Sequence, residues 1–242
     1  MRAIIDLDDR ATWPLAIHEE VAKWANKLDG TTEYTGGLAL RIEDELSFRD
    51  LFEGYLFRVY HCTRLMPHET DMVRKNGLRP LSAELITERV TAAKEYGCIT
   101  EQQASRFQNA HVFATGEQNN RKSQVCFVLS KNIFRNNIKA CNPLLTTWGG
   151  EGMYMSSGAK HFLAELKILG TPTIVIALIE TDKSKLSKVF PSLLKAFVGS
   201  TLGLKDANAD IFYKSSVPSQ HIENIYQPSN PKYGEFGELP SS

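Results

Sequence analysis

The spacing of the apolar segments restricts this chain of 242 residues to a small set of folds. Apolar runs bounded by turn residues predict strands at 55–64, 123–130, 173–180, 210–214 and 222–226. Helical patterns lie between some of these runs and only turns lie between others, whereas a doubly wound sheet alternates strand and helix regularly. We therefore expect an α+β fold in which two small, mostly antiparallel sheets bend around a cleft and helices cover the outside.

Three regions are expected along the chain. Residues 1–54 are expected to form a helical N-terminal preface, and residues 55–228 to form the main domain. A helical insert at 82–108 begins at Ser82, which is a typical helix-capping residue. The last residues, 229–242, are rich in Pro, Ser and Gly and are expected to be loosely ordered.

Three further segments have a predicted secondary structure but no predicted role in chemistry. Apolar side chains recur at helical spacing across 183–198, which predicts one amphipathic helix. Residues 111–115 are expected to form a short strand-like run, and residues 132–142 are expected to be irregular.

Composition narrows the environment and the partners of the chain. Lys and Arg number 28, as do Asp and Glu, so no overall field draws the protein toward nucleic acid or a membrane. No stretch approaches the ~20 apolar residues that span a bilayer, and the N-terminus lacks the apolar segment of a signal peptide. The four cysteines are scattered and the six histidines lack metal-binding spacing. We expect a reducing, cytoplasmic location and no bound metal.

The stretch WGGEGMYMSS, residues 148–157, combines glycines with an aromatic side chain. Three glycines in four positions let the backbone turn tightly and approach a ligand closely. The alternation that follows predicts a short strand with Gly152, Tyr154 and Ser156 on one face. Helical spacing then predicts a helix over 159–169. The alternative is a structural β-to-α connection without a ligand.

A second stretch, YLFRVYHCTR at 55–64, contains the other candidate side chains for chemistry. Its alternation predicts a strand, and a short helix follows at 69–76. The residues expected on one strand face are Phe57, Val59, His61 and Thr63. A histidine on such a face is more commonly a hydrogen-bonded core residue than a functional one, so its role depends on what lies beside it.

Together the two stretches resemble the ADP-ribosyltransferase superfamily, as a distant member of bacterial type. VYHCTR at 59–64, with its short helix, resembles the first motif of that superfamily. GEGMYMS at 150–156 resembles the second motif of the poly-ADP-ribose-polymerase-like members of H-Y-E type. Residues 210–213 and 217–222 are similar to the closing strands. The resemblance covers about 55–228 and leaves the preface uncovered.

The resemblance implies an enzyme that uses NAD as a co-substrate, releases nicotinamide and transfers ADP-ribose to a macromolecular acceptor, either protein or nucleic acid. A role as a toxin or defence factor fits this class. It implies that His61 hydrogen-bonds the adenosine-side ribose and that Tyr154 stacks on nicotinamide. Arg64 is a candidate for contact with the pyrophosphate. The residues expected to bind NAD are His61, Cys62, Thr63, Arg64, Gly150, Gly152, Tyr154 and Ser156.

The resemblance also implies a carboxylate near the ribose, where it stabilises an oxocarbenium-like transition state. The matching position has Asp210, one methylene shorter than the glutamate of the family. We prefer Glu151 with Asp210 second, because a carboxylate has no obvious structural duty in the glycine turn. The expected catalytic residues are Glu151, Tyr154, His61 and Asp210.

Two other functions stay open at this point. One is an RNA 2′-phosphotransferase-like enzyme, which has a similar fold and uses NAD but resembles a site richer in His and Arg. The other is a catalytically silent relative that binds a nucleotide or a partner protein, which the aspartate at 210 favours.

Overall fold

The computed structural model describes residues 2–27, 41–117 and 121–241. They are 46% helical and 20% strand, which confirms the α+β class. The strands are β1 (Ile4–Ile5), β2 (Leu56–Leu65), β3 (Val125–Val128), β4 (Thr171–Glu180), β5 (Leu186–Phe190), β6 (Asp210–Tyr213) and β7 (Ile222–Tyr226). They form one hydrogen-bonded sheet in the order β5–β6–β3–β2–β4–β7, with β1 beside β2, and not the two separate sheets expected. All its pairs are antiparallel except β1–β2.

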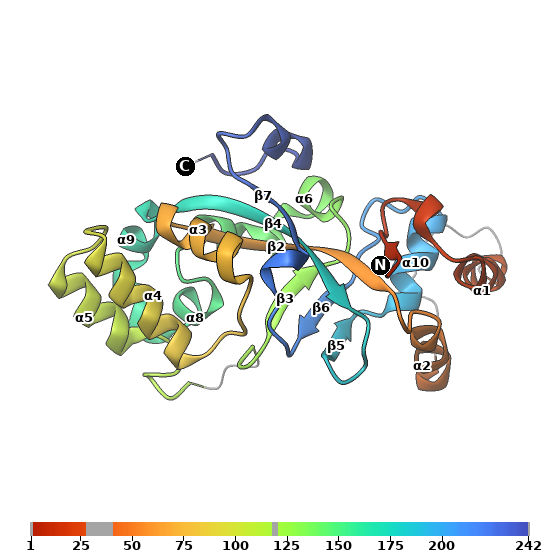
Figure 1. Ribbon diagram of the computed structural model, residues 1–242, viewed down its shortest axis with the longest axis horizontal. Helices are drawn as coiled ribbons and strands as arrows, with labels where there is room; N and C mark the ends of the chain where they lie inside the picture. The colour runs from red at the N-terminus through yellow and green to blue at the C-terminus, as the bar shows by residue number, and fades with distance from the viewer. Residues whose placement is uncertain (1, 28–40, 118–120, 242) are drawn as a thin grey trace.

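The sheet nearly divides in two between β2 and β3. Strands β2 and β4 pair along their whole length, from Leu56 opposite Glu180 to Leu65 opposite Thr171. In contrast, β2 meets β3 at one residue pair, Tyr60 and Val128. Figure 1 shows β3 and β6 running away from the long β2–β4 pair. Beyond Tyr60, therefore, no residue of β3 pairs with β2.

Helices gather at both ends of the sheet (Figure 1). Near one end lie α1 (Leu15–Asn26), α2 (Ile42–Asp50) and α10 (Leu193–Thr201), and near the other lie α3 (Pro67–Asn76), α4 (Ala83–Glu95), α5 (Glu101–Ala110), α8 (Glu151–Tyr154) and α9 (Leu163–Ile168). Helices α6 (Ile133–Asn136) and α7 (Ile138–Thr146) follow β3. The described residues also form four short 3-10 helices: η1 (Arg10–Thr12), η3 (Ser157–Phe162), η4 (Ser219–His221) and η5 (Pro231–Phe236).

The predicted insert is present, with the expected caps. The Ser82 hydroxyl accepts from the Leu85 amide, so α4 begins where the sequence predicts. Thr100 and Gln103 exchange hydrogen bonds as a capping box at the start of α5. Val90 and Phe107 are fully buried between these helices and the segment that contains the glycine turn.

The N-terminal preface shares the sheet and the main core with the rest of the chain. Strand β1 pairs with β2, and Trp13 packs on Phe197 with ring centroids 4.7 Å apart. Phe48, on α2, and Phe57, on β2, belong to the same buried cluster. Residues 28–40 of the preface lie outside the described residues.

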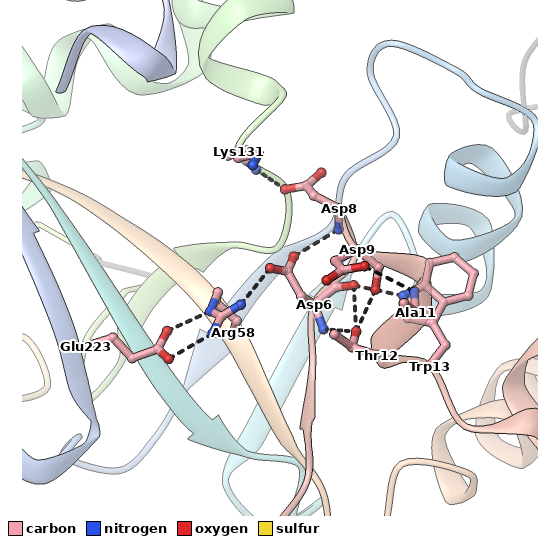
Figure 2. A network of polar contacts seen from close by, with 9 residues as sticks. All are labelled: Asp6, Asp8, Asp9, Ala11, Thr12, Trp13, Arg58, Lys131 and Glu223. Atoms are coloured by element: carbon pink, nitrogen blue, oxygen red, sulfur yellow. Dashed lines mark hydrogen bonds and ion pairs between the residues drawn. The ribbon is translucent and has the colours of Figure 1, made fainter. Parts of the chain in front are cut away.

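A polar network reinforces the attachment of the N-terminal segment (Figure 2). The Arg58 guanidinium on β2 donates to both carboxylate oxygens of Glu223 on β7, at 2.6 and 2.9 Å. It also donates to Asp6 at 2.9 Å. Asp8 accepts from the Lys131 amide at 2.7 Å, so the N-terminal segment contacts both β2 and the residues that follow β3, and it is linked to β7 through Arg58.

The end of the chain is packed, which differs from the loosely ordered tail expected for 229–242. Tyr233 and Phe236, on η5, are each 5% exposed. Phe236 contacts the rings of Tyr60 and Tyr226, with centroids 5.9 Å apart in both pairs. Aromatic burial therefore holds a segment whose Pro, Ser and Gly content suggested mobility.

Four local predictions were wrong. The expected helix over 183–198 is strand β5 followed by helix α10, with Pro191 between them. Residues 111–115 are a turn, because Ala114 and Thr115 both donate back to the His111 carbonyl. Residues 132–142 are helical in α6 and α7. The short strand expected at 152–156 is absent, and one helical turn, α8, takes its place.

Candidate functional site

Three adjoining cavities lie where β2 and β3 separate, and together they are called the cleft. The first, of about 140 Å³, lies between β2 and helices α3 and α4. The second, of about 110 Å³, lies between β2, β3 and the glycine turn. The third, of about 80 Å³, reaches β6. The polar residues that line the cleft are His61, Thr63, Glu69, Asn76, Arg79, Arg89, Arg121, Gln124, Glu151 and Asp210.

Strand β2 presents His61 and Thr63 to the first two cavities. His61 follows Tyr60, the one residue of β2 that pairs with β3. At this point a side chain and not the backbone links the two strands, because His61 Nδ1 donates to the Cys126 carbonyl at 2.8 Å. Its ring also forms a T-shaped contact with the ring of Phe127, with centroids 5.8 Å apart. Burial lowers the pKa of His61 below its ordinary value, and the positive charge of Arg89 acts in the same direction. The neutral ring is therefore favoured.

The glycine turn is built by two residues with left-handed backbone. Gly149 and Gly150 have φ of +85° and +56°. The amides of Met153 and Tyr154 both donate to the Gly150 carbonyl at 3.0 Å, which forms the helical turn α8 in place of a strand. Gly150 lines the second cavity, whereas a Cβ on Gly152 would lie 2.7 Å from Ile86 on α4. Gly152 thus permits close helix packing rather than ligand approach.

A buried carboxylate, that of Glu69, holds the start of the glycine turn through Trp148. Glu69, 5% exposed, accepts from Trp148 Nε1 at 2.9 Å, from the Met66 amide at 2.8 Å and from Arg89 Nε at 2.5 Å. Burial alone would raise the pKa of Glu69, but Arg89 and the other donors outweigh it and hold that pKa below its ordinary value. The ionised Glu69 therefore joins α3, α4 and the glycine turn.

Both candidate carboxylates reach the third cavity. Glu151, from α8, and Asp210, from β6, line it together with Arg121. Arg121 Nε lies 2.9 Å from Glu151 Oε2, and the Glu151 side chain is 16% exposed. Burial raises the pKa of Glu151, which Arg121 opposes and the charge of Asp210 reinforces. Burial likewise raises the pKa of Asp210, against the hydrogen bond from Asn208 and the charge of Arg121.

Glu151 and Asp210 differ in their relation to His61. Glu151 lines the second cavity with His61, as well as the third, whereas Asp210 lines only the third. Cys126 lines both of these cavities, and burial raises the pKa of its thiol to about 12, so the thiol is protonated at neutral pH.

Four of the residues expected to bind NAD do not line the cleft. Arg64 is 3% exposed and donates to the carbonyls of Leu169 and Leu145, at 2.6 and 3.2 Å. It therefore links β2 to α7 and to the residue that follows α9. Ser156 is fully buried and its hydroxyl accepts from the Gly158 amide. The other two are Gly152 and Tyr154.

Tyr154 lies beside the cleft without lining it. The structure therefore does not bring it together with His61 in one cavity, as was expected. Burial raises the pKa of its phenol to about 12, and the charge of Glu151 adds to this rise. The phenol is consequently neutral at ordinary pH.

Three arginines that were not singled out from the sequence converge on the second cavity. They are Arg79, which follows α3, Arg89, on α4, and Arg121, which precedes β3. Each is paired with a carboxylate: Arg79 with Glu88, Arg89 with Glu69 and Arg121 with Glu151. The three arginines are far apart in the sequence, and each lies in a helical or turn segment of mixed charge. The sequence therefore gives no sign that they form a cluster.

Comparison of the chain with protein-family models, with curated proteins and with solved structures finds no match in any of the three. The resemblance to ADP-ribosyltransferases therefore rests on the residues of the two motifs. Among the described residues no group of three or more His, Cys, Asp or Glu side chains could hold a metal ion. The same part of the chain contains no helix with the length and apolar character needed to cross a membrane.

Proposed function

We propose that the chain is an NAD-dependent ADP-ribosyltransferase that releases nicotinamide and transfers ADP-ribose to a macromolecular acceptor. The observation that carries this proposal is that His61, from the first motif, and Glu151, from the second, line one cavity. They are 90 residues apart in sequence, so their approach follows from the fold and not from local chain geometry. All four cysteines are free thiols, which supports a reducing, cytoplasmic setting.

The residue types of the cleft suit NAD as a co-substrate. With Nδ1–H bound to Cys126, the neutral His61 keeps Nε2 as an acceptor for a ribose hydroxyl. Arg79 and Arg89 are the candidates for the pyrophosphate, and they replace Arg64 in that role. Glu151 would stabilise positive charge as the bond to nicotinamide breaks.

The direct test is release of free nicotinamide from NAD by the full chain and by charge-removing variants. Glu151→Gln is expected to lower turnover on the order of a hundredfold, because it removes transition-state charge stabilisation and keeps the shape. Glu165→Gln is the matched control, since Glu165 also pairs with an arginine, Arg106, but lies outside the cleft.

The same assay decides between the two carboxylates. Asp210→Asn is expected to have the smaller effect, because Asp210 does not share the cavity of His61. Asp206→Asn, on the exposed loop before β6, is its control. A large loss in Asp210→Asn with none in Glu151→Gln would exchange the two roles. If neither substitution alters nicotinamide release, the enzyme assignment is wrong.

One observation favours a second candidate, the RNA 2′-phosphotransferase-like enzyme. Three arginines and one histidine line the second cavity, a set suited to a phosphate group next to NAD. Removal of phosphate from an RNA bearing a 2′-phosphate, in the presence of NAD, would select this function. A catalytically silent relative would give neither that product nor nicotinamide.

A further inference from the structure

A groove of about 580 Å³ lies beside the cleft, between helix α3 and the turn that follows α4. The residues that line it are Pro67, His68, Asp71, Met72 and Lys75 from α3 and Tyr96 and Cys98 from the turn. Met72 also lines the first cavity of the cleft, so the groove adjoins the proposed site. Three of the seven lining side chains, those of His68, Met72 and Cys98, carry a nitrogen or sulfur donor of the kind that binds metals.

His68 has a buried polar atom that the protein does not satisfy. The residue is 9% exposed, and its Nε2 is buried with no hydrogen-bond partner among the described residues. Its imidazole lies parallel to the ring of Tyr96, with centroids 4.3 Å apart. This stack covers one face of the imidazole, whereas a ring nitrogen binds a ligand in the plane of the ring. Because a buried polar atom without a partner is costly, a ligand bound to His68 would stabilise the fold here.

Two sulfur atoms line the groove with this imidazole. Met72 lies one helical turn beyond His68 on α3, which places their Cβ atoms about 5–6 Å apart on one side of the helix. Met72 is 44% exposed, so its thioether is open to a ligand. Cys98 is an exposed free thiol whose Sγ lies 3.9 Å from the Tyr96 carbonyl oxygen. The Cys98 amide donates to the Ala93 carbonyl at 2.8 Å, which fixes the turn to the end of α4.

We propose that the groove binds one Cu(I) ion through a ring nitrogen of His68, the thioether of Met72 and the thiolate of Cys98. Thioether and thiolate sulfur are soft ligands that select Cu(I), and imidazole also suits copper. The Cys98 thiol releases its proton to solvent as the bond from copper to sulfur forms, and the copper stays Cu(I). Zn(II) is excluded because it takes four ligands, and the described residues hold no group of three His, Cys, Asp or Glu side chains for it. This inference does not rest on the proposed function.

Competition with a chromophoric Cu(I) chelator, without oxygen, measures binding by the full chain, and one tightly bound Cu(I) is expected. Met72→Leu, which keeps an apolar side chain of similar size, and Cys98→Ser should each weaken binding on the order of a hundredfold, because loss of even a residue that only supports a metal ligand typically costs roughly 10–100-fold. Met155→Leu is the matched control, since Met155 is 56% exposed and lies outside the groove. Undiminished binding by Met72→Leu and Cys98→Ser would place the ion on other thiols and overturn the site, as would Zn(II) binding as tight as that of Cu(I).

A second measurement locates the ion, with Ag(I) as a soft probe that air does not oxidise. Alkylation followed by mass spectrometry of the peptides gives the rate at Cys98, which is exposed, whereas the other three cysteines are buried or half-buried. One equivalent of Ag(I) is expected to slow this rate about tenfold or more in wild type, and much less in Met72→Leu and His68→Gln. Thermal unfolding without metal checks that each variant is folded, and Met72→Leu carries the test if His68→Gln is not. Alkylation of Cys98 at an unchanged rate would overturn the proposal.

Discussion

The hydrogen bond of His61 decides which of its ring nitrogens is available to a ligand. A carbonyl oxygen can only accept a hydrogen bond, so Nδ1 carries the proton and donates it in a hydrogen bond of 2.8 Å to the Cys126 carbonyl. This bond also satisfies a β3 carbonyl next to the point where the β2–β3 ladder stops. A histidine that looked like an ordinary core residue in the sequence thus has a structural task and keeps Nε2 as an acceptor in the cleft.

The same residue gives a prediction for stability against pH. Its pKa is lowered in the folded chain from an ordinary value of 6.5, chiefly by burial, so below pH 6.5 the unfolded chain binds a proton that the folded chain refuses. The free energy of unfolding should therefore fall as pH is lowered. Wild type is expected to lose more stability than His61→Gln as the pH falls below that value.

Denaturant unfolding of both proteins at a series of pH values measures this difference. His111, whose pKa is also lowered by burial, is common to both proteins and cancels in the comparison. Parallel curves for wild type and His61→Gln would show that His61 is not the group responsible.

At the level of single residues, the sequence predicted part of the lining of the cleft, such as His61 and Glu151, and missed the residues that only the fold brings together. Alternation along one strand was enough to predict that His61 and Thr63 share a face. No local pattern could bring Arg79, Arg89 and Arg121 together, because they belong to three separate segments. Arg64 was misjudged because its neighbours in the motif are polar, whereas its side chain reaches carbonyls on the other side of the strand.

Among the elements, helix α3 depends on the glycine that ends it. Gly77 has φ of +80°, and a Cβ there would lie 1.8 Å from the Val217 carbonyl oxygen. The next residue, Leu78, exchanges backbone hydrogen bonds with Val217, which ties α3 to the segment before β7. Both the backbone conformation and the close approach exclude a side chain.

Gly77→Ala is therefore expected to destabilise the chain by more than about 3 kcal/mol, from strain together with a backbone clash. Gly97→Ala is the matched control, because Gly97 has φ of +69° with open space around it. It should cost only about 1 kcal/mol, the typical price of left-handed backbone alone. Thermal unfolding of both variants gives the comparison. Similar losses would mean that the segment at 217 moves aside without difficulty.

Helices whose apolar residues recur at helical spacing alone were predicted correctly. A segment whose apolar residues fit both a helix and a strand was not. Helices α4 and α5 have an apolar stripe and capped starts, and they form within the insert expected at 82–108. In residues 183–198 the apolar side chains satisfy a helical stripe, but Leu186 and Val189 are buried in β5 and Phe197 in α10. Pro191 was the available signal, since proline inside a helical pattern normally ends the helix.

At the scale of the whole molecule, a single pair of residues links the two halves of the sheet at the β2–β3 junction. The sequence predicted the α+β class of fold, because its strands are short and irregularly connected. It could not predict that the halves stay joined, since hydrogen-bond register between distant strands leaves no local trace. The joined sheet matters for the proposed site because Asp210, on β6, lines the same cavity as Glu151, on α8.

The preface contributes to that framework, although it lies outside the motifs. Trp13 is 5% exposed, contacts the ring of Phe197 and donates its Nε1–H to the Asp6 carbonyl at 2.8 Å. Asp6 in turn holds Arg58 on β2 (Figure 2). The N-terminal segment therefore covers apolar residues of the main core and completes an ion-paired network on the sheet.

A chain that begins at residue 55 is accordingly expected to lose its cooperative fold. Its Phe57 and Phe197, both fully buried in the full chain, would be exposed to water, and β2 would lose its neighbour β1. In the full chain, Trp13→Ala should cost about 3–5 kcal/mol, the usual range for a buried aromatic residue. Calorimetry of the fragment and of this variant tests both statements. A fragment that unfolds cooperatively near the melting temperature of the full chain would show that 55–228 is an independent domain, and a mild effect of Trp13→Ala would agree with that.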